Sequence, residues 1–218
     1  MFVLRKQESL IALKGFWCLT DTVMQNVLKH SINFFSDSCY YKHQYSTDLE
    51  AGVNKQIQAE QQAAHEYLNL AVTFLHPRIS RVGAGGFFMR MYHEEIQHME
   101  DLIQYQLYRG GIPSIKALNA PAPKDKITLL EAFKHALNME HCITELIKTL
   151  VSTAEKDKDY HCVNFLTTVF LKEQMNSIHN LSQHVTHIAR ISEDPDALHQ
   201  YDKYLQTSYP YKSKSPHK

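Results

Sequence analysis

Apolar positions recur with a helical period over most of this chain. Between residues 53 and 74 they follow one another at alternating steps of four and three, and the same spacing returns in residues 84–105. It appears again in residues 130–147 and 166–188. Steps of three and four place the apolar side chains on one face of an α-helix. The pattern therefore predicts an all-α protein built from four long helices.

Capping signals mark where several of these helices begin. Thr47 to Glu50 and Thr128 to Glu131 both have the spacing of a capping box, in which a threonine and a glutamate close the first helical turn. Asp194-Pro195 is typical of an N-cap followed by proline at the first helical position. We therefore expect a short fifth helix after residue 194.

Glycine and proline divide the helical segments. Gly83, Gly85 and Gly86 are expected to weaken the start of the second helix, so that its first turns fray, and Gly110-Gly111 to end it. Residues 110–127 contain three prolines and show no helical period. At about 3.3 Å per residue, this segment is long enough to cross the length of a bundle. We predict a long crossover between the second and third helices.

Each of the four apolar faces is interrupted near its middle by a residue that binds metals. These residues are Glu60, Glu95 with His98, Glu140, and Gln174. Glu95 and His98 are three residues apart, so both side chains lie on one helix face and form the E-x-x-H half-site of carboxylate-bridged di-metal bundles.

An unpaired buried carboxylate costs several kcal/mol, so acids at one level of a core need positive charge between them. Two divalent cations would supply that charge. Oxygen-rich ligands with a single imidazole favour iron or manganese. The alternative is that these acids face solvent or pair with lysine and arginine. Tyr67 follows Glu60 by seven residues and shares its face, either as a core tyrosine or as a hydrogen-bond or electron donor to the site.

Composition narrows the classes of partner and compartment. Lysine plus arginine and aspartate plus glutamate both number 23, so no net charge favours nucleic acid or an anionic membrane. The sequence contains no run of about 18 apolar residues, so we predict no membrane span. The four cysteines form no C-x-x-C pair and are expected to be reduced, which favours the cytoplasm. An organellar or secreted location is the alternative if residues 1–45 are a targeting segment.

We divide the chain into an N-terminal extension of unknown structure (residues 1–45), a helical domain (46–206) and a polar, loose C-terminal tail (207–218).

The helical domain resembles the eukaryotic ferritins of the heavy-chain type. The matching stretches are residues 54–57, 93–98, 109–111, 136–140, 171–174 and 184–186. The resemblance implies a ferritin-like four-helix bundle with a long crossover and a short fifth helix. It also implies that the ferroxidase residues of the family are Glu60, Tyr67, Glu95, His98, Glu140 and Gln174. Fe(II) would be oxidised to Fe(III) by dioxygen or peroxide. The ferric mineral would be stored in a twenty-four-subunit shell, with or without other ferritin subunits.

Two sets of positions depart from the family pattern. The mineral-nucleating acids of the family fall on Glu94, Gln97 and Glu100, and the glutamine is expected to weaken nucleation. The acids that line the iron channel of the family fall on Asn164 and Thr167. Iron is then expected to enter more slowly, or by a route that uses Glu155, Asp157, Asp159 or His161.

Three other functions compete with an iron-oxidising storage enzyme. A non-catalytic shell subunit would be expected to lack the ligands. A di-iron oxygenase would need a second E-x-x-H, but Glu173 is followed three residues later by Asn176. A DNA-protecting mini-ferritin would lack the fifth helix and place its ligands between subunits.

Overall fold

The computed structural model describes residues 42–121 and 127–211. From His43 the chain forms one compact unit. Most of the predicted N-terminal extension (residues 1–45) and of the predicted tail (207–218) lies outside the described residues.

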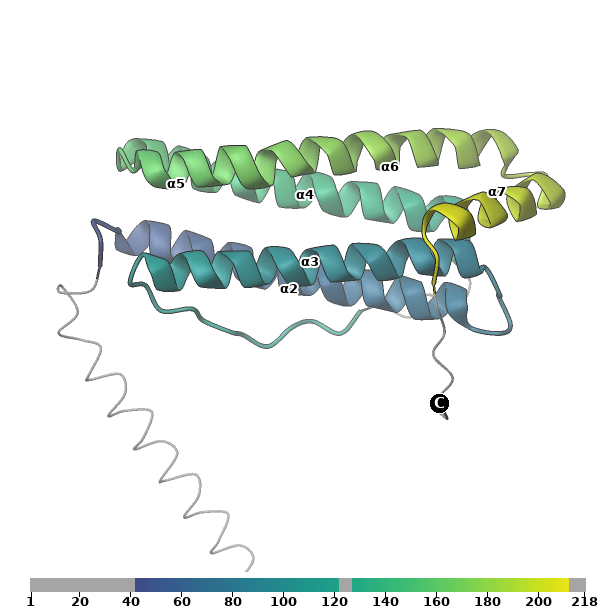
Figure 1. Ribbon diagram of the computed structural model, residues 1–218, viewed down its shortest axis with the longest axis horizontal. Helices are drawn as coiled ribbons and strands as arrows, with labels where there is room; N and C mark the ends of the chain where they lie inside the picture. Colours follow the sequence, from purple (N-terminus) through teal and green to yellow (C-terminus); the bar gives the residue numbers. More distant parts are fainter. Residues whose placement is uncertain (1–41, 122–126, 212–218) are drawn as a thin grey trace, which may run out of the picture. The chain divides into compact units, whose positions relative to one another are not determined.

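The described residues form helices and no strands, so the all-α prediction is confirmed. Helices α2 and α3 lie side by side, and α4 lies beside the continuous rod made by α5, η2 and α6 (Figure 1). The short helix α7 lies across one end of the bundle (Figure 1). The elements in chain order are α2 (Thr47–Leu75), α3 (Val82–Tyr108), α4 (Leu129–Lys156), α5 (Tyr160–Phe165), η2 (Leu166–Leu171), α6 (Lys172–Ile191) and α7 (Pro195–Ser208).

The predicted crossover between α3 and α4 runs along the bundle (Figure 1). Two side chains of α2 hold it. The Asn54 amide donates to the carbonyl of Ile112 (3.0 Å) and accepts from the N–H of Ser114 (2.8 Å). The Gln62 amide likewise donates to the carbonyl of Asn119 (3.1 Å) and accepts from its N–H (3.0 Å). These bonds satisfy backbone groups that a loop without secondary structure would otherwise leave to water.

The helix starts agree with the capping signals with one exception. Thr128 and Glu131 form a complete capping box, and the Asp194 side chain accepts from the first turn of α7. The box predicted at Thr47 is wrong by one residue. Ser46 is the N-cap of α2, and its hydroxyl accepts from the N–H of Leu49. Serine is the better N-cap of the two, which agrees with Ser46, although the backbone angles that decide the position cannot be read from sequence.

The glycines at the start of α3 allow close packing, and the helix includes all three from its start at Val82. The expected fraying stays a prediction. A Cβ on Gly83 would lie 1.9 Å from the carbonyl oxygen of Asp202, and one on Gly86 would lie 2.3 Å from that of Tyr209. The Asp202 carboxylate accepts from the N–H groups of Gly83 (3.2 Å) and Ala84 (2.9 Å). An acid from α7 therefore caps the N-terminus of α3, where the helix dipole favours negative charge.

The described part of the predicted tail, residues 207–211, was expected to be loose, but it packs against the bundle. Helix α7 continues to Ser208, and the ring of Tyr209 packs edge-on against Phe87 at 4.9 Å between centroids. The guanidinium of Arg90 lies 5.4 Å from the centroid of the same tyrosine ring. Residues 208–211 thus line a pocket against α3.

The apolar faces of α2 and α3 are buried as predicted, from Val53 to Phe74 and from Ala84 to Tyr105. In α4 the buried face is rotated slightly from the predicted one. Ala132 and Ala136 are fully buried, whereas Leu130 and Leu137 are half-buried. Alanine carries too little hydrophobic signal to define a face from sequence.

A π-helical segment, η2, interrupts the rod formed by α5 and α6, and the sequence pattern did not predict it. Within it, the hydroxyl of Thr167 donates to the carbonyl of Val163 (2.7 Å) and that of Thr168 donates to the carbonyl of Asn164 (2.7 Å). Threonine hydroxyls that bond carbonyls one turn back compete with the helical N–H groups and bend helices. Gln174, Leu181 and Ile188, which the pattern placed on the core face, are nevertheless buried in α6.

Arg109 ties together the end of the bundle opposite α7. Its guanidinium forms an ion pair with Asp159 (2.6 Å) and donates to the hydroxyl of Tyr105 (2.6 Å). It also donates to the carbonyls of His43 (3.0 Å) and Gln44 (3.3 Å). One buried cation therefore fixes the start of the domain, the end of α3 and the start of α5.

Within the described residues, none of the helices is both long and apolar enough to cross a bilayer.

His184 gives the fold a predicted sensitivity to acid. The ring is buried between α6 and α7, its Nδ1 lies 2.7 Å from the Tyr201 hydroxyl, and burial followed by repulsion from His187 lowers its pKa to about 4. The unfolded chain therefore binds this proton first, near pH 6.5. Stability is fully present above that pH and falls by about 2–3 kcal/mol as the pH drops to about 4.

Urea denaturation at pH 7 and pH 4.5 measures this loss. We expect His184→Gln to lose less stability than wild type between the two pH values, and the exposed control His199→Gln to behave as wild type. An identical pH dependence in wild type and His184→Gln would contradict the prediction.

Candidate metal centre

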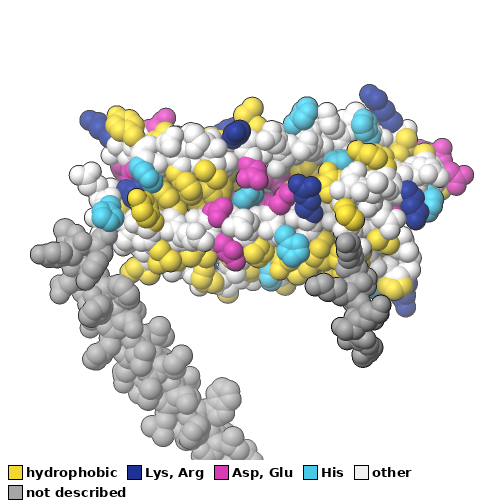
Figure 2. Space-filling model, viewed as in Figure 1, with side chains coloured by type: hydrophobic (Ala, Val, Ile, Leu, Met, Phe, Trp, Pro, Cys, Tyr) yellow, Lys and Arg dark blue, Asp and Glu magenta, His cyan; other side chains and the backbone are white. Residues whose placement is uncertain are grey.

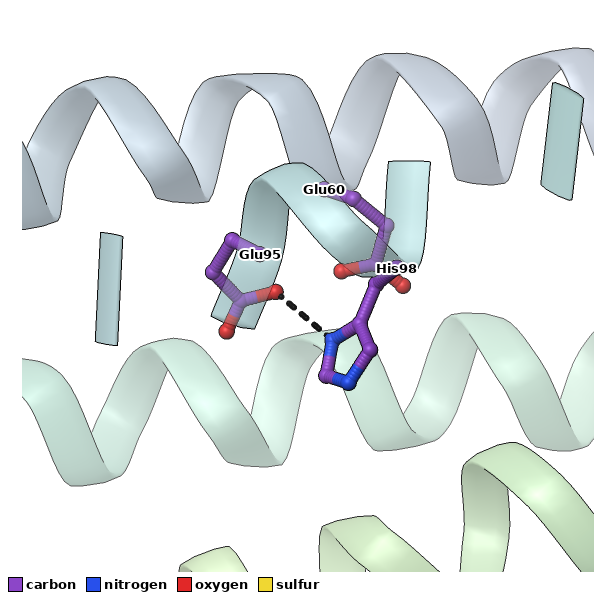
Figure 3. Close-up of side chains that lie close together, drawn as sticks. All are labelled: Glu60, Glu95 and His98. Carbon is purple, nitrogen blue, oxygen red and sulfur yellow. Dashed lines mark hydrogen bonds and ion pairs between the residues drawn. The ribbon is translucent and has the colours of Figure 1, made fainter. Parts of the chain in front are cut away.

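Three ligand-type side chains converge at the centre of the bundle. Glu60 comes from the middle of α2, and Glu95 and His98 come from the middle of α3 (Figure 3). One ligand atom of each lies within 4.8 Å of the others, and all three side chains are buried. In the part of the chain that the structure describes, no other group of three histidine, cysteine, aspartate or glutamate residues meets this criterion.

The carboxylate of Glu60 is bonded through one oxygen only. The Gln56 amide donates to its Oε1 at 2.7 Å. Its Oε2 is buried and has no hydrogen-bond partner among the described residues. A buried acceptor without a donor costs about 1–3 kcal/mol, so this oxygen is the clearest sign in the fold of a place for a cation.

His98 lies between two carboxylates. Its Nδ1 is 3.2 Å from Oε2 of Glu95, and its Nε2 is 3.2 Å from Oε2 of Glu173 on α6. The imidazole edge also packs on Phe170, with 5.7 Å between ring centroids. The Glu173 side chain is 49% exposed. Glu173 therefore connects the buried group to the surface. Figure 2 shows several acidic side chains near the middle of one face of the bundle.

Sequence reasoning missed this position of Glu173. We considered it only as the start of a second E-x-x-H, which Asn176 rules out. The signal available was its place immediately before Gln174, which breaks the apolar face of the same helix. Both side chains follow shortly after the π-helical segment η2, which the sequence pattern does not show.

Glu140 and Gln174 close the group from the other helix pair. The Gln174 amide donates to the Glu140 carbonyl (3.2 Å) and to its Oε2 (2.9 Å). The Tyr67 hydroxyl donates to the other oxygen of the same carboxylate. Burial, and then the charge of Glu140, raise the pKa of Tyr67 well above its usual range, so the phenol stays protonated and acts as a donor. All six sequence-predicted site residues are thus buried, and the charge of Glu140 acts on Glu95 across the centre of the bundle.

The electrostatics of the group favour a bound cation. Burial raises the pKa of Glu60 well above its usual range, and repulsion from Glu95 adds to the effect. Burial, and then repulsion from Glu140, raise the pKa of Glu95 in the same way. Positive charge between these carboxylates would reverse both effects. The donor set, mostly oxygen with one imidazole, fits iron or manganese better than a structural zinc site.

The predicted mineral-nucleating residues lie on another face of α3. Glu94 forms an ion pair with Arg90 at 2.7 Å, and the Gln97 amide donates to Asp101 at 2.9 Å. Glu100 is exposed. Nucleation at Glu94 and Glu100 stays a prediction, and the arginine lowers the negative charge available at Glu94.

The predicted channel positions lie at the start of the rod that leads into α6. Asn164 is exposed, and the hydroxyl of Thr167 is bonded to the backbone. Of the alternative acids, Asp159 is held by Arg109, and Asp157 accepts from the hydroxyl of Ser46 at 2.5 Å.

The sequence of this chain matches known proteins over most of its length. The family model described as a ferritin-like domain matches residues 50–191. The Ferritin-1 heavy chain of Schistosoma mansoni is 30% identical over 165 residues, which are 72% of this chain and 95% of the relative. A ferritin of Pacifastacus leniusculus is 32% identical over 168 residues, with 77% and 92% covered. The soma ferritin of Lymnaea stagnalis is 31% identical over 150 residues, with 69% and 86% covered.

Replacing Glu60 by glutamine is expected to stabilise the metal-free protein. The change removes one of the repelling buried charges while keeping the shape, which raises the free energy of unfolding by about 1–3 kcal/mol at pH 7. The folded-state pKa of Glu60 is raised, so the penalty of its charge is present at high pH and disappears as the pH falls below the ordinary glutamate value.

Thermal unfolding with and without Co²⁺ tests this. Wild type should gain stability from the cation, and Glu60→Gln should gain little. The control is Glu145→Gln, because the Glu145 side chain is 71% exposed. A metal-free Glu60→Gln that is less stable than wild type would contradict the prediction.

Proposed function

Because the chain belongs to the ferritin family, we propose that it stores iron and that it is a ferroxidase, with the buried group of Glu60, Glu95 and His98 as the core of its oxidation site. The observation that carries the proposal is the buried, unbonded Oε2 of Glu60 beside an E-x-x-H pair. A buried oxygen without a hydrogen-bond donor destabilises the fold, but it is free to bind a metal ion.

Fe(II) is the substrate of the proposed reaction. Glu60, Glu95 and His98 would bind one ion, and Glu140 with Gln174 would help to bind a second, with Glu95 between the two. Each ion gives up one electron. Two ions together reduce dioxygen and two protons to hydrogen peroxide, or peroxide and two protons to water. Close placement of both ions turns two separate one-electron steps into one two-electron reduction.

The surrounding side chains have positioning roles in this proposal. Gln174 and Tyr67 donate to Glu140 and hold its carboxylate at the centre of the bundle. The half-exposed Glu173 gives Fe(II) a first carboxylate on the way to His98. The iron-oxidising groups all come from one chain, as expected for a site within a subunit.

The proposal includes storage of the ferric product in a shell of twenty-four subunits. The family supports assembly. Exposed apolar side chains at the end of α3 and on the crossover also support it, because such groups on a surface mark places of contact. They are Leu107, Tyr108, Ile112 and Ile115.

The oxidation site is tested by removing two of its ligands. We expect the double variant Glu60→Ala with His98→Ala to oxidise Fe(II) in air at least about tenfold more slowly than wild type, since one complete binding position is lost. The measurement is the initial rise of ferric absorbance. The control is Glu145→Ala together with His199→Ala, which changes the same residue types at exposed positions.

Size-exclusion chromatography would show whether each variant keeps the assembled mass of wild type. Equal oxidation rates in wild type and the double variant would leave the site without a catalytic role.

The route of iron is tested by ionic strength. With Asn164 and Thr167 at the positions of the channel acids, no strong negative potential draws Fe(II) inward, so salt has little to screen. We expect the oxidation rate of the assembled protein to change by less than about twofold between low and high salt. The variant Asn164→Asp with Thr167→Glu should be faster at low salt and slow down as salt is added. A wild-type rate that falls steeply with salt would contradict the prediction.

A further inference from the structure

We propose that Gln56 is a positioning residue of the metal centre, and that its amide fixes which oxygen of Glu60 is free to bind metal. The inference rests on the proposed function, because it concerns how one ligand of that site is held.

Gln56 has a place that packing does not explain. It is 2% exposed, in a helix face that is otherwise apolar apart from Glu60. Burying an amide is unfavourable unless it is hydrogen-bonded. Its Nε2 donates to Oε1 of Glu60 at 2.7 Å, the length of a charge-assisted bond. The amide thus serves the carboxylate.

The two residues are four apart on α2, so they lie one above the other on the same face. The bond from Gln56 therefore comes along α2 and occupies one oxygen from the side of its own helix. Figure 3 shows the Glu60 side chain reaching from α2 toward Glu95 and His98 on α3. With Oε1 taken, Oε2 is the oxygen without a donor.

A comparison with Glu140 shows that this arrangement is specific. Both oxygens of Glu140 accept hydrogen bonds, one from Tyr67 and one from Gln174. Glu60 is equally buried and has a donor on one oxygen only. A carboxylate held by a single amide has its rotation restricted while half of its lone pairs stay available. Outer partners of this kind commonly change metal affinity by about 10- to 100-fold.

The experiment removes the donor and keeps the volume. Gln56→Met has a side chain of similar length and shape without an N–H. The matched control is Gln106→Met, since Gln106 is also fully buried but bonds to Tyr45 and to the carbonyl of Glu50, away from the metal centre. Glu60→Ala reports loss of the ligand itself. Gln56→Asn is the second variant, because it keeps an amide too short to reach Oε1.

Each assembled, metal-free protein is titrated with Co²⁺ under anaerobic conditions, and both the affinity and the visible spectrum of the bound ion are recorded. We expect Gln56→Met and Gln56→Asn to bind Co²⁺ about 10- to 100-fold more weakly than wild type and with altered visible bands. Gln106→Met should keep the wild-type affinity and spectrum even if it unfolds at a lower temperature.

The outcomes separate this inference from the proposed function. If wild type binds no Co²⁺, or Glu60→Ala binds it as wild type does, the proposed metal centre fails. If wild type binds, Glu60→Ala does not, and either folded Gln56 variant matches wild type in affinity and spectrum, the role of Gln56 alone is overturned. Equal weakening in Gln56→Met and Gln106→Met would reduce the role of Gln56 to packing and would also overturn the inference.

Discussion

Mutual repulsion among three buried carboxylates is the constraint on which the rest of this structure depends. Glu60, Glu95 and Glu140 are buried in the middle of the bundle, and no lysine or arginine of the described residues is among the main influences on the pKa of Glu60 or Glu95. Hydrogen bonds from Gln56, Gln174 and Tyr67 offset part of the cost, and one oxygen is left without any donor. A bundle selected only for stability would fill this level with leucine. The retained charge is therefore best explained by a cation that the protein binds.

The ends of the bundle keep the ligands in register. At one end Arg109 joins the start of the domain to α3 and α5. At the other, Asp202 caps α3, and the absence of side chains at Gly83 and Gly86 lets α7 approach its backbone. Helices that could slide or rotate would separate Glu60 on α2 from His98 on α3, and an ångström of misplacement matters for a metal ligand. The polar contacts of Arg109 and Asp202 thus hold the two ends of the bundle, where they oppose sliding and rotation of the helices.

The ligand-type side chains of the site are buried, and Glu173 beside His98 is half-exposed. Tyr67, Phe88 and Phe74 stack between the helices on the α7 side of the metal centre and exclude water there. Glu173 leads outward between α3 and α6. A dry interior strengthens every electrostatic interaction with a bound cation. On the surface of α3, Arg90 is paired with Glu94, so the acids along this helix are unequal in their charge.

The sequence by itself determined the helices and the candidate ligands. Apolar residues at steps of three and four predicted the positions of α2 and α3, because this pattern is local and repeats at every turn. Polar residues within those apolar faces then identified Glu60, Glu95 and His98. Only the tertiary structure decided the partners. The contact of Glu173 with His98 depends on which helices meet, and that of Gln56 with Glu60, four residues apart on α2, depends on side-chain direction. From the sequence, the glycines of α3 were expected to destabilise the start of the helix. In the fold they allow α7 and Tyr209 to pack closely against it, which depends on tertiary contacts that the sequence does not show.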